Sequence, residues 1–168
     1  MNLRKSINNI LRIKSQYHLI GYSVIKVTGS DSNTFLNGQL TNNVKILEVN
    51  SFQKSALTDI KGKLISEFFL LKESDDTYFL IVQKSLTEST LERLELYLIS
   101  EDVEFSDHNL QPTIHFNDNS NGFIGKAYNL DIAISFESNS GAQSILDKEF
   151  NLLKFLSGET EVHKHAVP

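Results

Sequence analysis

Two short polar turns constrain this chain more than any other feature, because they join three consecutive runs of strand-forming side chains. The first turn is T-D-I-K-G at 58–62, where Asp and Gly favour a tight reversal between the runs at 51–57 and 63–72. The second is E-S-D-D at 73–76, and the run that follows it at 77–82 is rich in β-branched and aromatic residues. Strands joined by such short turns lie antiparallel, so we expect a three-stranded antiparallel sheet here.

Two segments show the apolar spacing of helices. A helix is predicted within 31–40, where three apolar side chains share one face: Phe35, Leu36 and Leu40. A second helix is predicted from Ser85, which has the spacing of a capping box with Glu88. Its inward face is expected to carry Leu91, Leu94 and Leu98, and its outward face Glu92, Arg93 and Glu95.

The remaining segments complete an α+β pattern. Strand signals recur in five further runs, at 22–27, 103–106, 113–116, 123–128 and 132–136. Residues 140–156 allow either a helix or, in their last part, a strand ending at Gly158. Adjacent hairpins with few helices favour an α+β fold of mainly antiparallel sheets over a doubly wound parallel sheet. A chain of 168 residues is expected to form a single domain over 1–168.

Composition excludes several function classes. The chain has no cysteine, and therefore supplies no disulfide, thiolate zinc ligand, cysteine nucleophile or iron–sulfur ligand. Its 16 basic and 21 acidic side chains give a net charge of -5, which predicts no direct binding of nucleic acid. The apolar runs are too short to cross a membrane, and residues 1–14 lack a signal-peptide core, so we expect a cytoplasmic protein. A basic amphipathic mitochondrial presequence over 1–14 is the less favoured alternative to a short surface helix.

Few residues carry a chemical signature by themselves. Lys61, Gly62 and Lys63 could hold an anion, because glycine permits close backbone approach and the lysines add charge, although a plain hairpin turn is the simpler interpretation. His163 and His165 would share one face of a strand, but they lie close to the last residue, where chains commonly fray, and we expect no metal site. Nucleotide-binding glycine loops and the serine-hydrolase elbow are absent from the sequence.

Four segments, taken in order, resemble one protein family. They are V-T-G-S-D-S at 27–32, F-L-N-G-Q-L-T-N-N-V at 35–44, D-I-K-G-K-L at 59–64 and D-D-T-Y-F-L at 75–80. Together they resemble the YgfZ branch of the folate-binding aminomethyltransferase family, which also contains the T-protein of the glycine cleavage system. The match is good from about 22 to 107 and looser from there to Leu156, and L-S-G at 156–158 resembles the family's segment leading into G-x-P.

The resemblance implies an α+β tetrahydrofolate-binding domain. For the YgfZ branch it also implies a role in supporting iron–sulfur enzymes, including those that modify tRNA. By position, it places Tyr22 and Phe150 where the family has folate-contacting tryptophans, and the lysines of 61–63 would attract the glutamate tail of folate. A pterin or p-aminobenzoyl ring stacks on such aromatic faces. The alternative is that both aromatic residues belong to the core.

Three departures from the family pattern bear on function. The family's K-G-C-Y-x-G-Q-E motif and its C-terminal barrel are absent from these 168 residues, which fits either an N-terminal fragment or loss of that function. Ser66 and Glu67 stand where the T-protein has an Asp-Asp pair used in transfer chemistry. We therefore assign no catalytic residue and expect a folate-binding protein with tetrahydrofolate or a derivative as its ligand. A folate-free interaction module on the same fold is the alternative, and an aminomethyltransferase is the least favoured interpretation.

Overall fold

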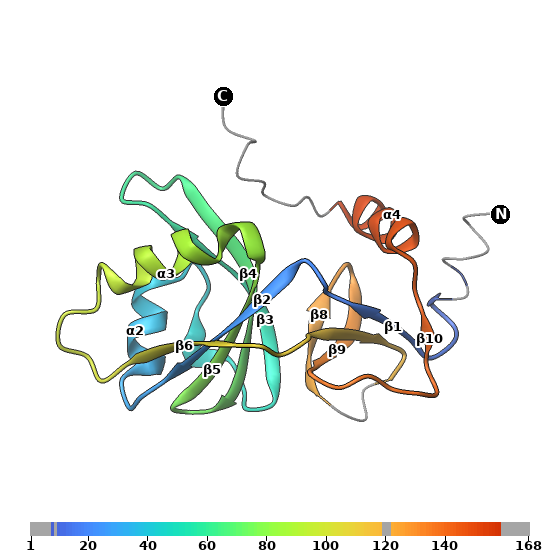
Figure 1. Cartoon of the computed structure of the whole chain (residues 1–168), viewed down its shortest axis with the longest axis horizontal. Helices are drawn as coiled ribbons and strands as arrows, with labels where there is room; N and C mark the ends of the chain where they lie inside the picture. Colours follow the sequence, from blue (N-terminus) through green and yellow to red (C-terminus); the bar gives the residue numbers. More distant parts are fainter. Residues whose placement is uncertain (1–7, 9, 119–121, 159–168) are drawn as a thin grey trace. The chain divides into compact units, whose positions relative to one another are not determined.

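The computed structural model describes residue 8 and residues 10–118 and 122–158 (Figure 1). The chain divides into two compact units. The central unit comprises residues 21–110, and the terminal unit comprises the described residues of 1–20 and 111–161. The single folate-binding-type domain expected over 1–168 stays a prediction.

The described residues of the central unit form an antiparallel sheet in the order β3-β4-β5-β2-β6. Its strands are β2 (Tyr22–Thr28), β3 (Ser51–Thr58), β4 (Leu64–Ser74), β5 (Thr77–Gln83) and β6 (Glu104–His108). The predicted meander is confirmed, because β3, β4 and β5 pair in sequence order through the two polar turns.

Two helices cover one face of the central sheet, α2 (Ser32–Gln39) and α3 (Thr87–Glu95) (Figure 1). Strand alternation turns every second side chain toward them, so Ile25 and Val27 of β2 and Phe68 and Leu70 of β4 join the buried core. The short 3₁₀ helices η1 (Val44–Ile46) and η2 (Lys84–Leu86) connect these elements. One core cluster therefore lies between the sheet and its two helices. The middle of the opposite sheet face is buried as well, at Val24, Phe69, Leu71, Phe79 and Ile81.

The start of α3 differs from the prediction. Residues 84–86 form η2, and α3 begins at Thr87 with Leu86 at the N-cap, so Ser85 does not cap it. The reason is that Leu86 is buried in the core, which requires a tighter turn before the helix. Arg93 was also expected to point outward, but its Nε donates to the Thr58 carbonyl at 3.2 Å and its guanidinium lies 3.8 Å from the Tyr97 ring centroid.

The described strands of the terminal unit lie side by side in the order β10-β1-β7-β9-β8. All its pairs are antiparallel except β1 with β10. Its elements are β1 (Ser15–His18), β7 (Thr113–Phe116), β8 (Phe123–Ala127), β9 (Leu130–Ser135), β10 (Gln143–Ser144) and α4 (Asp147–Ser157). The ambiguous segment 140–156 is thus mainly helical, and α4 ends at Ser157 with Gly158 as its C-cap at a φ of 75°.

The α+β prediction is confirmed by these mainly antiparallel strands and their helices. None of the helices in the described ranges is long and apolar enough to cross a membrane.

Candidate functional site

Tyr22 begins β2 and lies half-buried on the sheet face opposite α2 and α3. Alternation along β2 requires this, because Ile25 and Val27 point into the core beneath the helices. The register pairs Tyr22 with Gln83 of β5 and pairs Val82 with Phe68, so Glu67 follows on the Tyr22 side of β4. Tyr22 therefore stands at the end of the sheet where β4 begins.

Two lysines share this face with Tyr22. Lys26 Nζ lies 5.7 Å from the Phe79 ring centroid, and Lys54 Nζ lies 5.9 Å from that of Phe69. Both distances are typical of cation–π contacts. Motif comparison missed these lysines, although the two-residue period of β2 predicts that Lys26 and Tyr22 face the same way. We call the surface formed by Tyr22, Lys26, Lys54 and Glu67 the Tyr22 face.

The lysine turn between β3 and β4 is organised by Asp59. Its Oδ1 accepts hydrogen bonds from the amides of Lys61 and Lys63, both at 2.8 Å, and its carbonyl accepts one from Gly62. The Lys63 amide foremost, and then the Lys61 amide, lower the pKa of the Asp59 carboxyl. Because these amides are engaged, the turn offers an anion its two exposed ammonium groups rather than its backbone.

Ser66 and Glu67, which the resemblance places at the position of the T-protein's Asp-Asp pair, face opposite ways. Ser66 is buried toward α3, where its hydroxyl lies 2.8 Å from Thr90 Oγ1, and Thr90 Oγ1 lies 2.7 Å from the Leu86 carbonyl. Because Thr90 donates its proton to that carbonyl, its oxygen accepts from Ser66. Ser66 thus holds α3 against the sheet, and Glu67 alone contributes to the Tyr22 face.

Phe150 lies in the terminal unit on α4 and is only 1% exposed. The Tyr17 ring stacks on it with centroids 3.9 Å apart, and the Tyr128 ring meets it edge-on at 5.3 Å. A folate ring would have to displace Tyr17 before it could stack on this face of Phe150. These contacts favour the core interpretation, and a folate contact at Phe150 stays a prediction.

The terminal unit contains a polar cavity of about 230 Å³, lined in part by His115, Asp118 and Ser135. Ser135 Oγ donates to the Glu137 carbonyl at 2.7 Å and lies 2.8 Å from His115 Nε2. Since the serine proton is used, the histidine nitrogen donates to Ser135. Burial is the main cause that lowers the pKa of His115, which keeps the imidazole neutral near neutral pH.

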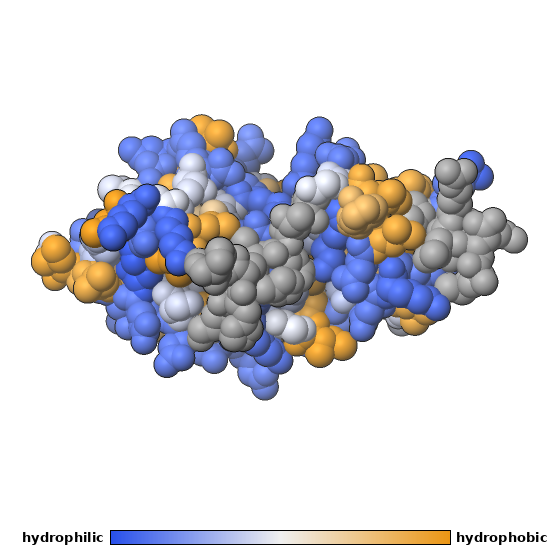
Figure 2. Space-filling view, turned by 90° about the horizontal axis from the view of Figure 1, so that it is seen from above, coloured by the Kyte–Doolittle hydropathy of each residue, from blue (hydrophilic) through white to orange (hydrophobic). Residues whose placement is uncertain are grey.

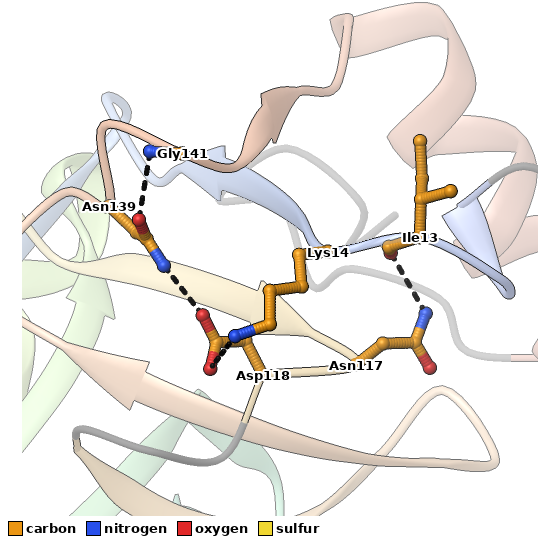
Figure 3. Close-up of polar contacts among 6 residues, drawn as sticks. All are labelled: Ile13, Lys14, Asn117, Asp118, Asn139 and Gly141. Carbon is orange, nitrogen blue, oxygen red and sulfur yellow. Dashed lines mark hydrogen bonds and ion pairs between the residues drawn. The ribbon is translucent and has the colours of Figure 1, made fainter.

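Asp118 belongs to a clasp beside this cavity (Figure 3). Its carboxylate accepts from Lys14 Nζ at 3.3 Å and from Asn139 Nδ2 at 2.6 Å. Next to it, Asn117 Nδ2 donates to the Ile13 carbonyl at 3.0 Å. These bonds tie the segment before β1 to the loops after β7 and β9, so we assign them a structural role.

The described ranges contain no group of three or more His, Asp or Glu side chains that could hold a metal ion. His163 and His165 lie outside the described residues.

Comparisons with known proteins match about half of the chain. A segment of 87 residues, 52% of the chain, is 36% identical to an uncharacterized protein of Haemophilus influenzae and covers 31% of that protein. A segment of 83 residues is 34% identical to the tRNA-modifying protein YgfZ of Vibrio vulnificus, covering 49% of this chain and 25% of that protein. A segment of 77 residues is 30% identical to an aminomethyltransferase of Bacillus cytotoxicus, covering 46% of this chain and 21% of that enzyme.

The fold has a match among solved structures. The glycine cleavage system aminomethyltransferase T of Bartonella henselae superposes on 68% of this chain with a TM-score of 0.59 and 12% sequence identity, over 32% of its own chain. No protein-family model matches the sequence. The chain therefore shares an aminomethyltransferase fold, and these partial matches support the resemblance seen in its motifs, while each match spans less than a third of the other protein.

Proposed function

We propose that this chain binds a reduced folate, tetrahydrofolate or a derivative, on the Tyr22 face. The observation that carries the proposal is the half-buried residue Tyr22 on the same sheet face as Lys26 and Lys54. A tyrosine ring stacks on a pterin or p-aminobenzoyl group, and ammonium groups bind carboxylates through charge-assisted hydrogen bonds. Similarity to an aminomethyltransferase and to YgfZ, in sequence over part of the chain, supports this ligand class.

The lysine turn extends this surface. It precedes β4, and therefore lies at the same end of the central sheet as Tyr22. The exposed ammonium groups of Lys61 and Lys63 would attract the glutamate tail of the folate, while the aromatic part stacks on Tyr22.

Aminomethyl transfer is not part of the proposal. Transfer by the T-protein pattern needs two carboxylates, whereas Ser66 is buried and bonded to Thr90, which leaves only Glu67. We propose instead that folate binding supports iron–sulfur enzymes and affects tRNA modification indirectly, because a net charge of -5 does not favour direct contact with tRNA.

Calorimetric titration of the full chain with tetrahydrofolate and 5-formyltetrahydrofolate tests the proposal. We expect a micromolar dissociation constant, which corresponds to about -8 kcal/mol. Absence of heat at high micromolar protein and ligand would contradict folate binding and favour the folate-free interaction module.

A further inference from the structure

The loop between α3 and β6 carries two strongly exposed apolar side chains. Leu96 is 72% exposed and Ile99 is 89% exposed. Figure 2 shows apolar surface at the left side of the view, where Figure 1 places this loop. Single exposed apolar side chains are ordinary, but two on one short loop need an explanation.

This loop is held in place on both sides of Ile99. The Glu101 carboxylate accepts hydrogen bonds from the amides of Ile99 and Ser100, both at 3.0 Å. On the other side, Leu98 packs against the central core. Because the loop is already ordered, it loses little conformational entropy when a partner binds at Ile99.

Asp102, which follows this part of the loop, is held in place by hydrogen bonds to the turn at Ser30 and Asp31. The Asp102 amide donates to Asp31 Oδ2 at 2.8 Å, and the Asp102 carboxylate accepts from the Ser30 hydroxyl at 2.8 Å. The loop is thus bonded to the turn that precedes α2.

A cavity of about 290 Å³ lies between this loop and α2, lined on the loop side by the two residues that follow Ile99. Its lining includes Phe35 and Gly38 of α2 and Ser100 and Glu101 of the loop. A Cβ atom at Gly38 would have no other atom within 4 Å, so this part of the helix borders free space. The cavity has room for one medium-sized apolar side chain.

Acidic side chains predominate at this loop. Asp31 and Glu101 line the cavity, and the stretch from 92 to 104 also carries Glu92, Glu95, Asp102 and Glu104. The single basic residue between 92 and 104, Arg93, is already engaged with the Thr58 carbonyl and the Gln39 side chain. Hydrogen bonds from the Ser100 and Ile99 amides lower the pKa of Glu101, and those from the Ser30 amide and hydroxyl lower that of Asp102, so both stay ionised at neutral pH.

We infer that this acidic tip, defined by Leu96, Ile99 and the adjacent cavity, docks a protein segment that presents an apolar side chain flanked by lysine or arginine. The apolar side chains supply contact area, and the surrounding carboxylates select a basic partner. A second copy of this chain would bring the same negative charge, and so would a membrane rich in anionic lipids. This inference does not depend on folate binding.

Amide NMR spectra of the full chain, titrated with three short synthetic peptides, test the inference. The peptides share one apolar core and carry Lys, Gln or Glu on either side of it. We expect the Lys peptide to shift the amides of residues 96–101 and of α2, the Gln peptide to bind about tenfold more weakly, and the Glu peptide not to bind. Added salt should weaken binding of the Lys peptide, because it screens the attraction between the peptide's lysines and the exposed carboxylates.

Three variants locate the binding surface. Leu96→Ser combined with Ile99→Ser should lower the affinity for the Lys peptide by about tenfold or more. Because both side chains are exposed, replacing them does not open the core. Gly38→Leu should block the cavity from the α2 side while the spectrum of the folded protein is kept. Ile46→Ser is the matched control, because Ile46 is 73% exposed on η1 and does not line the cavity.

Several outcomes would overturn the inference. They are equal binding of the Lys and Glu peptides, no shift at millimolar peptide, and unchanged affinity in the Leu96→Ser, Ile99→Ser double variant. Sedimentation that becomes concentration-dependent and is abolished by this double variant would assign the tip to self-association instead. Co-flotation with phosphatidylserine vesicles that the double variant abolishes would assign it to lipid. Folate titration of the same variants should match the wild type, so failure of one proposal is distinguishable from failure of the other.

Discussion

Tyr22 can be either a ligand platform or a core residue, and one substitution separates the two. Tyr22 as a whole residue is half-buried, and a ligand platform requires that part of its ring reaches solvent in the free protein. We expect Tyr22→Ala to lose roughly 1–3 kcal/mol of folate affinity, as at other stacking aromatics. Its loss of folding stability should stay well below the ~3–5 kcal/mol of emptying a buried aromatic site. Calorimetry and thermal unfolding of the same variant measure both quantities, and Tyr22→Phe, which keeps the ring, is the control. A strongly destabilised Tyr22→Ala that binds folate normally would remove Tyr22 from the site.

Gly29 explains why the V-T-G-S-D motif needs glycine. Its φ is +131°, and a Cβ atom there would lie 2.0 Å from the Asp102 carbonyl oxygen. Because this backbone cannot shift without breaking the Asp31 and Asp102 bonds, Gly29→Ala should lose on the order of 3 kcal/mol of unfolding free energy. Gly38→Ala, in free space within α2, should instead be stabilising by ~0.5–1 kcal/mol. Chemical denaturation compares the two, and a Gly29→Ala variant as stable as wild type would show that the turn adapts.

His115 should make folding stability depend on pH. Its pKa in the folded protein is lowered from 6.5, chiefly by burial, so the unfolded chain takes up a proton at a higher pH than the folded chain. Folding stability should therefore not depend on the His115 proton while pH stays above 6.5, and it should fall as pH drops below 6.5. His115→Gln should remove this part of the pH dependence, whereas His108→Gln on β6 of the other unit serves as control. Denaturation midpoints measured between pH 7.5 and pH 5 check this, and identical slopes for wild type and His115→Gln would contradict it.

At the scale of elements, the sequence predicted those helices and strands whose formation depends on neighbouring residues. The β3-β4-β5 meander follows from two polar turns, and α2 from the spacing of its apolar residues. The start of α3 could not be predicted in this way, because the burial of Leu86 depends on the packed core. The inward turn of Arg93 likewise depends on Thr58, which is remote in sequence. Of the lysines of the Tyr22 face, Lys26 was within reach of strand alternation along β2, whereas Lys54 required the register from β3 through β4 and β5 to β2.

The β3-β4 turn gives a prediction about the tail of the ligand. Lys61→Glu combined with Lys63→Glu should weaken binding of a polyglutamylated folate by about tenfold and affect the monoglutamate less, because exposed charges attract at a distance. Stability should change little, since the backbone bonds to Asp59 remain. Lys45→Glu, exposed on η1, is the matched control. Equal losses for both folates at the double variant would mean that the turn does not distinguish the tail.

At the scale of the whole molecule, the division into two units was beyond local prediction. The terminal unit joins residues from both ends of the sequence, and β1 pairs with β7 and β10, which lie about a hundred residues away. β1 is short and begins with Ser15 and Gln16, so it has no strand signal of its own. Such pairings depend on contacts between residues that are distant in sequence. They were therefore not expected from composition or from the spacing of apolar residues.

Net charge gives the last prediction at this scale. With 21 acidic and 16 basic side chains, the chain carries -5 and can release few counterions from a phosphate backbone. Arg93 and Lys14 are further engaged in contacts with neighbouring groups, which reduces the cations available to a nucleic acid. We therefore expect no retention of tRNA at physiological salt, so that any effect on tRNA modification passes through another protein. A gel shift with unfractionated tRNA near 150 mM salt measures this directly. A discrete complex below micromolar protein would contradict it, and loss of that complex in Lys61→Glu, Lys63→Glu would assign the contact to the lysine turn.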